Sequence, residues 1–420
     1  MTDPTGFVRE RSRGETAAAL LRTTTAVRDR CGQLLDRARV GQSQWFTVDD
    51  GRLREAATAI IRSIRRRAGS HATPYSRWRH LEAGRVDGRA ELHRLLGDVA
   101  PQVRAHALVD LAVVTVLLDV PADGSWKYVE PATGTTLHGP EATAVAAFHA
   151  FTAGLFSSDK LRPLQVDAQA LRALPTDGLL QALQVREGNA LPGLNTRAVL
   201  LRRLGEVMAE QPEVFTDDAR PSGLFDLLVG DEGGIAHSAD VDAHDILSQL
   251  LVSLSPIWPV GHSIGGVPLG DCWRHSAVRG DGASDGWVPF HALSQWLTYS
   301  LLEPFEWSGV QVRGIDRLTA LPGQHEGGLL LDAGVLRLRE PDAARQAWHP
   351  GDEIVVEWRA LTVALLEELA GTVRGDLGAS GGGLPLSVVV GGAADAGLDC
   401  ARREREGRTA LLVQAEAPLA

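Results

Sequence analysis

The sequence predicts a mostly α-helical, multi-helical globular fold with a few short strands. Apolar residues recur every three or four positions through much of the chain, which is the spacing of helices with one buried face. Runs with the pattern of strands are few and short. With 420 residues, 44% hydrophobic and 23% charged, the chain can bury a substantial core in one large domain or two.

Helical spacing predicts the elements in chain order. The second pattern ends in the basic run Arg62–Arg67, where cations suit the negative end of a helix dipole. The predicted helices cover about 16–37, 52–67, 103–119, 141–155, 196–209, 242–254, 290–303 and 355–373. The predicted strands are Lys127–Glu130, Ser387–Val390 and Leu411–Val413.

Proline and glycine interrupt the second half of the chain. Residues 256–289 hold four prolines, many glycines and three tryptophans. A long irregular segment in a compact domain is usually functional or disordered, and the tryptophans favour function. Gly378–Gly383 predicts a flexible connection. We expect an N-terminal helical lobe, a C-terminal helical lobe with the main motifs, and a site between them. The predicted lobes are 1–240 and 241–420.

Composition excludes several classes of protein. A formal net charge of −11 argues against binding to a nucleic-acid polymer. Cys31, Cys272 and Cys400 are too far apart for a zinc site and odd in number for a disulfide framework. The charged N-terminus does not resemble a signal peptide, and the apolar run Leu108–Leu118 is too short to span a bilayer. We expect a cytoplasmic protein with no metal, cofactor or membrane contact.

The tripeptide Trp-Arg-His occurs twice, at Trp78–His80 and Trp273–His275. Each copy offers a flat apolar face, a forked cation and a proton carrier. Two interpretations stay open: the copies form one site from both halves of the chain, or each packs at the edge of a helical core.

The second copy is followed by a predicted helix with a polar stripe. Asp271 lies two residues before Trp273 and either positions a water molecule with Arg274 and His275, or caps a helix that begins at Cys272. His291, Gln295 and Tyr299 recur at helical spacing and form either a binding stripe or an ordinary half-exposed face. The core face of this helix carries Phe290, Leu293, Leu297 and Leu301.

Two further features are interpreted as structural or accidental. Asp110 lies in an apolar helix and needs a partner, for which the arginines of the two copies are candidates. Gly261–Gly265 fits the Gly-x-Ser-x-Gly elbow of serine hydrolases, but prolines on both sides do not suit the strand and helix that Ser263 would require. The phosphate-binding loop, the dinucleotide fingerprint and the His-Glu-x-x-His motif do not occur in the sequence.

At these motifs the chain resembles a family of uracil-catabolism proteins that is catalogued as a domain of unknown function. The resemblance follows the expected order along most of the chain. The matching stretches are Ser76–Gly84, Asp110–Asp119, Ala153–Asp159, Gly193–Gly205, Gly223–Asp226, Pro256–Pro259, Leu269–His275, Val288–Pro304, Leu329–Arg339 and Glu357–Leu361.

The resemblance implies a role in a pyrimidine-degradation route that ends in urea. In addition, Val288–Leu336 resembles the queuosine-nucleotide N-glycosylases, which implies a C-terminal half similar to DNA glycosylases. Together these resemblances imply hydrolysis of an N-ribosyl bond, with ribosylurea or its 5′-phosphate as substrate. Such a reaction needs a carboxylate to stabilise an oxocarbenium-like transition state. The alternative is a non-catalytic or divergent nucleotide-binding partner of a ring-opening enzyme. Other pyrimidine-catabolism enzymes are expected partners.

Two departures from the family pattern affect the predicted site. The family usually has lysine at the position of Ala292 and a run that begins with glutamate at the position of Gly323. Glu326 could replace that carboxylate only if the loop is rebuilt. The predicted catalytic residues are Asp271, His275 and Glu326. The predicted substrate-binding residues are Arg77, Trp78, Arg79, His80, Trp273, Arg274, His291 and Gln295.

Overall fold

A computed structural model describes residues 4–67, 75–83, 87–119, 126–230, 239–258, 262–379 and 383–414, with side chains in the first range from 12 to 66. Helices dominate these residues, which confirms the predicted mostly α-helical class. None of the described helices combines the length and apolar character needed to cross a bilayer. The helices are α1 (Pro4–Leu21), α2 (Thr24–Arg39), α3 (Leu53–Arg67), α4 (Trp78–Leu81), α5 (Gly88–Leu96), α6 (Pro101–Leu117), α7 (Gly139–Thr152), α8 (Ala168–Arg172), α9 (Thr176–Ala182), α10 (Leu194–Glu210), α11 (Pro212–Phe215), α12 (Gly223–Val229), α13 (Ala243–Leu254), α14 (Ala292–Trp307), α15 (Gln324–Asp332), α16 (Glu353–Leu377) and α17 (Leu386–Arg405).

The described strands are two or three residues long and form two-stranded pairs. Three of these pairs join segments far apart in the chain, and three are local hairpins. The distant pairs are β1 (Phe46–Val48) with β10 (Leu336–Leu338), β4 (Asp240–Asp242) with β9 (Gln311–Arg313), and β11 (Ala347–Trp348) with β12 (Leu412–Val413). The hairpins are β2 (Lys127–Val129) with β3 (Thr136–His138), β5 (Ser263–Ile264) with β6 (Val267–Pro268), and β7 (Cys272–Arg274) with β8 (Trp287–Pro289).

Local sequence sets where several helices begin. Thr23, Asp87, Asp167 and Asp242 each accept a hydrogen bond from a backbone N–H in the first turn of the helix that follows, which satisfies an otherwise unpaired donor. Proline occupies the first turn of α6 and of α7, where its missing N–H costs nothing.

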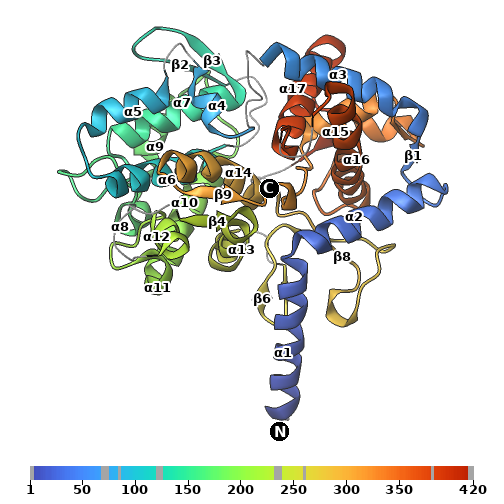
Figure 1. Cartoon of the computed structure of the whole chain (residues 1–420), viewed down its shortest axis with the longest axis horizontal. Helices are drawn as coiled ribbons and strands as arrows, with labels where there is room; N and C mark the ends of the chain where they lie inside the picture. The colour runs from blue at the N-terminus through green and yellow to red at the C-terminus, as the bar shows by residue number, and fades with distance from the viewer. Residues whose placement is uncertain are drawn as a thin grey trace.

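Helices from both ends of the chain pack together. Helix α2 packs on α16, and α17 packs on α3 and α15. In Figure 1, α14 lies between these helices on one side and α4 and α6 on the other. A single large apolar core runs through both groups, while α1 packs by Ala17, Ala18 and Leu21 against the segment that holds β5–β8. Packing therefore crosses residue 240 in both directions, and a division of the chain there stays a prediction.

Two of the three predicted strands are confirmed and one is wrong. Strands β2 and β12 lie within the first and third predicted segments. Ser387–Val390 instead belongs to α17 and is buried. Its β-branched run favours a strand by itself, but this face of α17 packs against other helices, and burial outweighs the small difference in propensity. Of the predicted Gly378–Gly383 connection, 380–382 lie outside the described residues.

The partner of Asp110 also differs from the prediction. Its fully buried carboxylate pairs with Arg220 at 2.6 Å and accepts hydrogen bonds from the backbone N–H groups of Val166 and Ser222. The arginines of the Trp-Arg-His copies lie elsewhere. Asp110 therefore joins α6 to the segments that precede α8 and α12, a structural role that agrees with the prediction.

Candidate functional site

Helix α14 connects the two Trp-Arg-His copies. Ala292, Trp296, Ser300 and Glu303 recur at helical spacing and share one face of this helix. The first copy contacts Ser300 and Glu303, whereas Asp271, beside the second copy, accepts a hydrogen bond from the N–H of Ala292 at 3.1 Å. Eleven residues of α-helix separate the two ends of this face, about 16 Å. The copies thus lie at opposite ends of one helix face, with Trp296 between them.

The first copy is fixed to the C-terminal half of α14. The indole N–H of Trp78 donates to the carbonyl of Ser300 at 2.9 Å, and its ring meets Trp307 edge-on at 4.9 Å. Arg79 pairs with Glu303 and with Glu82, each at 2.7 Å. Since Glu303 is buried, Arg79 supplies the charge that makes its burial tolerable.

Arg77, directly before this copy, orients a carboxylate that the sequence did not single out. Its fully buried guanidinium lies 2.8 Å from Asp119, which follows α6, and 3.0 Å from Nδ1 of His80. It also donates to the carbonyl oxygens of Thr115 and Pro140, which fixes its plane. The side chain of Asp119 is 14% exposed and is thus partly open, unlike that of Arg77.

Aromatic rings cover Asp119 on the α14 side. The indole N–H of Trp296 donates to Asp119 at 3.3 Å, and the ring of Tyr75 lies 4.5 Å from that of Trp296. The ring of His80 lies 6.0 Å from Trp296. We refer to Tyr75, Arg77, His80, Asp119 and Trp296 as the Asp119 cluster.

Arg197 of α10 belongs to the electrostatic surroundings of this cluster. Burial lowers the pKa of Arg197 to about 10, while the charge of Asp119 opposes this shift and that of Arg77 adds to it. Sequence reasoning missed Asp119 and Arg197. The available signal was that each lies in a stretch that resembles the uracil-catabolism family, and that Asp119 follows a helix end, where a carboxylate needs cations nearby.

Asp271 is saturated with partners. Arg359 of α16 binds both of its oxygens, at 2.9 and 2.7 Å, and the indole N–H of Trp273 donates to one of them at 2.7 Å. The N–H of Ala292 completes the set. Burial alone would raise the pKa of Asp271, but the charge and hydrogen bonds of Arg359, with the bonds from Ala292 and Trp273, hold it below its ordinary value. Asp271 therefore anchors β7, α14 and α16 to one another. It caps α14, whereas Cys272 begins a strand instead of the helix that the capping interpretation expected.

His275 and Arg274 follow different paths from the same strand. Nε2 of buried His275 lies 3.3 Å from Glu357, and its Nδ1 accepts from the N–H of Ala277. Exposed Arg274 stacks on Trp287 at 4.2 Å and donates to the carbonyl of Asp285. The two copies thus make separate sets of contacts.

The predicted polar stripe of α14 is buried and bound to protein groups. Nε2 of His291 lies 2.9 Å from the carbonyl oxygen of Leu21, and burial lowers the pKa of this imidazole. The side-chain amide of Gln295 exchanges hydrogen bonds with Thr319, whose carbonyl oxygen accepts from the hydroxyl of Tyr299. These contacts hold the segment before α15 against α14.

Glu326 lies in the first turn of α15 and is 4% exposed. Its carboxylate folds back over Gly323 so closely that a side chain at position 323 would collide with it. Glu326 therefore places a carboxylate beside position 323, where the family usually has a glutamate. Burial, with a smaller contribution from Asp395 of α17, raises the pKa of Glu326 to about 7.

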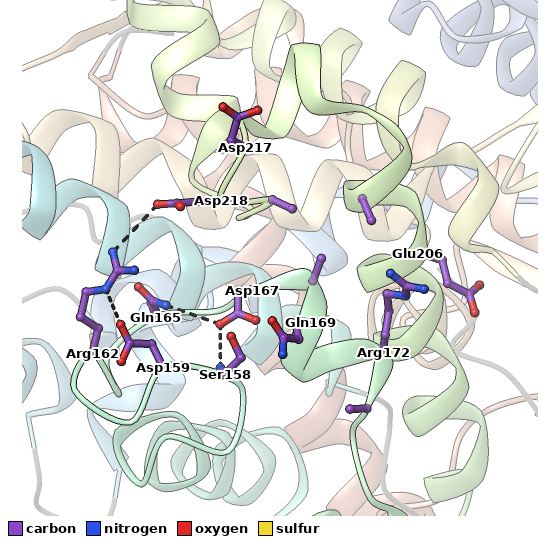
Figure 2. Close-up of a pocket in the computed structure, with 14 residues that line it drawn as sticks. Ser158, Asp159, Arg162, Gln165, Asp167, Gln169, Arg172, Glu206, Asp217 and Asp218 are labelled. Carbon is purple, nitrogen blue, oxygen red and sulfur yellow. Dashed lines mark hydrogen bonds and ion pairs between the residues drawn. The ribbon is translucent and has the colours of Figure 1, made fainter.

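A polar cavity of about 820 Å³ lies away from these residues, between the 158–167 loop, α8, α10 and the 217–219 turn (Figure 2). Arg162 in its wall pairs with Asp159 at 2.8 Å and approaches Asp218 at 4.0 Å. Asp167 accepts from the N–H of Ser158 at 2.7 Å and caps α8. We take the Asp119 cluster as the candidate site, because it adjoins the first Trp-Arg-His copy and four of its five residues lie in stretches that resemble the uracil-catabolism family.

Comparisons with known proteins agree with the predicted family. A family model described as "Protein of unknown function (DUF1688)" matches residues 20–417. "Protein urg3" of Schizosaccharomyces pombe is 36% identical over 369 residues, which cover 86% of this chain and 87% of that protein. "Uracil catabolism protein 4" of Lachancea kluyveri is 32% identical over 379 residues, which cover 83% of this chain and 86% of that protein. The chain therefore belongs to the DUF1688 family.

Proposed function

We propose that this protein acts in uracil catabolism as an N-ribosyl hydrolase that releases urea from ribosylurea or its 5′-phosphate. The name of the Lachancea kluyveri relative supports the pathway. The observation that carries the reaction class is the Asp119 carboxylate, oriented by buried Arg77 and covered by Trp296. An accessible carboxylate in partly apolar surroundings suits the stabilisation of an oxocarbenium-like cation at C1′.

Asp119 takes the role that the sequence suggested for Asp271. Each oxygen of Asp271 already has two partners, which leaves it little capacity to orient water. Asp119 has Arg77 and Thr143 on one oxygen and Trp296 on the other. The flat ring of Trp296 is suited to stack on the planar urea group.

The experiment is urea release by purified protein from synthetic ribosylurea and from its 5′-phosphate. We expect release from at least one of them, and a loss of about 10²–10³-fold in kcat for Asp119→Asn, since electrostatic stabilisation of the transition state is removed. Asp218→Asn, an exposed carboxylate in the separate polar cavity, is the matched control and should keep its rate.

Tight binding of either compound without urea release would instead support the nucleotide-binding partner. Full activity of Asp119→Asn would contradict the assignment of the site even if the wild type releases urea. Comparison of the two substrates also determines whether the 5′-phosphate contributes to kcat/KM.

A further inference from the structure

We infer that His80 is a catalytic residue that donates a hydrogen bond to the oxygen of the departing urea group when an N-ribosyl bond is cleaved beside Asp119. This role rests on the proposed function and adds the group that stabilises the leaving side of the bond. As the C1′–N bond breaks, its electron pair passes to the urea nitrogen, and the adjoining carbonyl oxygen shares the negative charge. A fixed hydrogen-bond donor at this oxygen lowers the barrier.

One nitrogen of Arg77 contacts both His80 and Asp119. Nη1 of Arg77 lies 3.0 Å from Nδ1 of His80 and 2.8 Å from the carboxylate of Asp119. The ring of Trp296 lies 6.0 Å from that of His80, and its indole N–H donates to Asp119. Whereas Arg77 is fully buried, His80 and Asp119 are both partly exposed. The imidazole and the carboxylate are therefore close enough for one small molecule to contact both.

The contact with Arg77 determines which nitrogen of the His80 ring carries the hydrogen. A guanidinium group has only N–H donors, so Nδ1 of His80 accepts the hydrogen bond from Arg77. The ring then carries its hydrogen on Nε2, which makes Nε2 a donor. A second proton, on Nδ1, would point at the cation of Arg77 and is disfavoured. His80 is thus a neutral imidazole that donates through Nε2, the form that suits a carbonyl oxygen as acceptor.

A second arginine–histidine pair in the chain has the same contact in different surroundings. Nη1 of Arg104 lies 3.0 Å from Nδ1 of His93 in α5. Burial lowers the pKa of His93, and the charge of Arg104 adds to this shift, as expected when a cation faces an imidazole nitrogen. The other amino group of Arg104 donates to a backbone carbonyl, whereas Arg77 also holds the carboxylate of Asp119. The carboxylate is what distinguishes the pair at His80.

Asp119 and His80 then act on the two sides of the bond that breaks. A ribosylurea with C1′ against Asp119 carries its urea oxygen next to the leaving nitrogen, on the side where His80 donates. The C1′–N bond breaks with its electron pair going to nitrogen, while Asp119 stabilises the cation at C1′ and His80 the charge on oxygen. Water then adds to C1′, and one of its protons goes to the urea nitrogen, which yields urea. His80 keeps its own proton, because a neutral imidazole acts as a hydrogen-bond donor and not as an acid.

The test separates the two nitrogens of His80. In His80→Asn the side-chain oxygen still accepts from Arg77, but the donor at the position of Nε2 is lost. In His80→Gln the longer amide restores a donor at that position and gives up the contact with Arg77. The substrate is ribosylurea, with or without the 5′-phosphate as the wild type requires. We expect His80→Asn to slow urea release by about 10²–10³-fold and His80→Gln by less than about tenfold.

A second substrate and a matched variant are the controls. The matching nitrophenyl riboside has a leaving group that spreads its charge into the nitro group, so His80→Asn should change its cleavage by less than about threefold. His93→Asn removes the same kind of donor from the pair with Arg104, which lies in the first turn of α6, whereas Asp119 follows the other end of this helix. His93→Asn should change neither rate.

Equal slowing of both substrates by His80→Asn would mean that His80 only holds Arg77 in place, and unchanged urea release would exclude the donor altogether. A greater loss in His80→Gln than in His80→Asn would also overturn the role, and this order decides if the wild type does not accept the riboside. If His80→Asn does not fold, a loss above about tenfold in His80→Gln overturns the role.

The failure of this role and the failure of the proposed function give different results. A wild type that releases no urea would overturn both together. An inactive Asp119→Asn beside a fully active His80→Asn would overturn the role of His80 alone.

Discussion

The two Trp-Arg-His copies have the same three side chains but place them in different surroundings. The first is the helix α4, where successive side chains point about 100° apart, so Trp78 enters the core while Arg79 reaches a carboxylate of α14. The second is the strand β7, where side chains alternate, so Trp273 is buried and Arg274 faces solvent. The first copy borders the partly exposed carboxylate of Asp119, whereas in the second copy buried His275 lies beside Glu357 and exposed Arg274 stacks on Trp287. Backbone conformation, rather than the tripeptide, decides what the residues can do.

The largest effect on stability is expected when Asp271, which anchors the second copy, is replaced. Asp271→Ala leaves the buried guanidinium of Arg359 without its carboxylate, and breaking one side of such a pair costs about 3–5 kcal/mol in the free energy of unfolding. Denaturant unfolding measures this loss. Asp281→Ala, an exposed residue of the same segment, is the control and should stay within about 0.5 kcal/mol. Unchanged stability of Asp271→Ala would show that the second copy is not an anchor.

The next prediction concerns how stability depends on pH, which should differ between Asp271 and Glu326. The pKa of Glu326 is raised from 4.5 to about 7, so its proton stabilises the folded state below pH 4.5 and this contribution is lost as pH rises to about 7. This difference in pKa corresponds to about 3 kcal/mol in the free energy of unfolding. The pKa of Asp271 is lowered, so its contribution has the opposite sign and is lost as pH falls through the acidic range.

Unfolding by urea at several pH values measures both contributions. Glu326→Gln should remove most of the decline in stability between pH 4.5 and 7 while leaving the loss at lower pH in place. A decline that persists in this variant would assign it to other groups.

The smallest effect compares the same position in the two copies. Arg79→Ala removes the cation beside buried Glu303 and should cost about 1–3 kcal/mol, the penalty for a buried polar group that loses its partner. Arg274→Ala removes an exposed stacking contact with Trp287 and should cost about 0.5–1 kcal/mol. Thermal unfolding of both variants gives the order. A larger cost for Arg274→Ala would reverse the assignment of the two copies.

Helix positions follow well from the sequence because burial has a helical period. The predicted 242–254 corresponds to α13 at Ala243–Leu254, and 355–373 lies within α16 at Glu353–Leu377. The failure at Ser387–Val390 has a physical cause. Three consecutive valines resemble a strand, and only the neighbouring helices that cover α17 make a helix the better solution.

The candidate site follows less well because it depends on contacts between distant segments. Asp119 and Trp296 are 177 residues apart, and no local pattern pairs them. The predicted Gln295 is placed on α14 as expected, but its amide is bound to Thr319. Glu326 can lie over Gly323 only because glycine has no Cβ, and the spacing of residues in the sequence does not reveal this contact. The catalytic and binding roles of the predicted residues therefore stay predictions.

The packing of α2 on α16 has a consequence for synthesis. Arg28 and Glu367, which form an ion pair between these helices at 2.9 Å, are 339 residues apart. At roughly 5–20 residues per second, the ribosome needs about 20–70 s between them. During that time the apolar faces of α2 and α3 remain exposed, because α16 and α17, on which they pack, have not yet been synthesised. Truncated chains that end before α16 should therefore be the forms of this protein that chaperones retain and that aggregate.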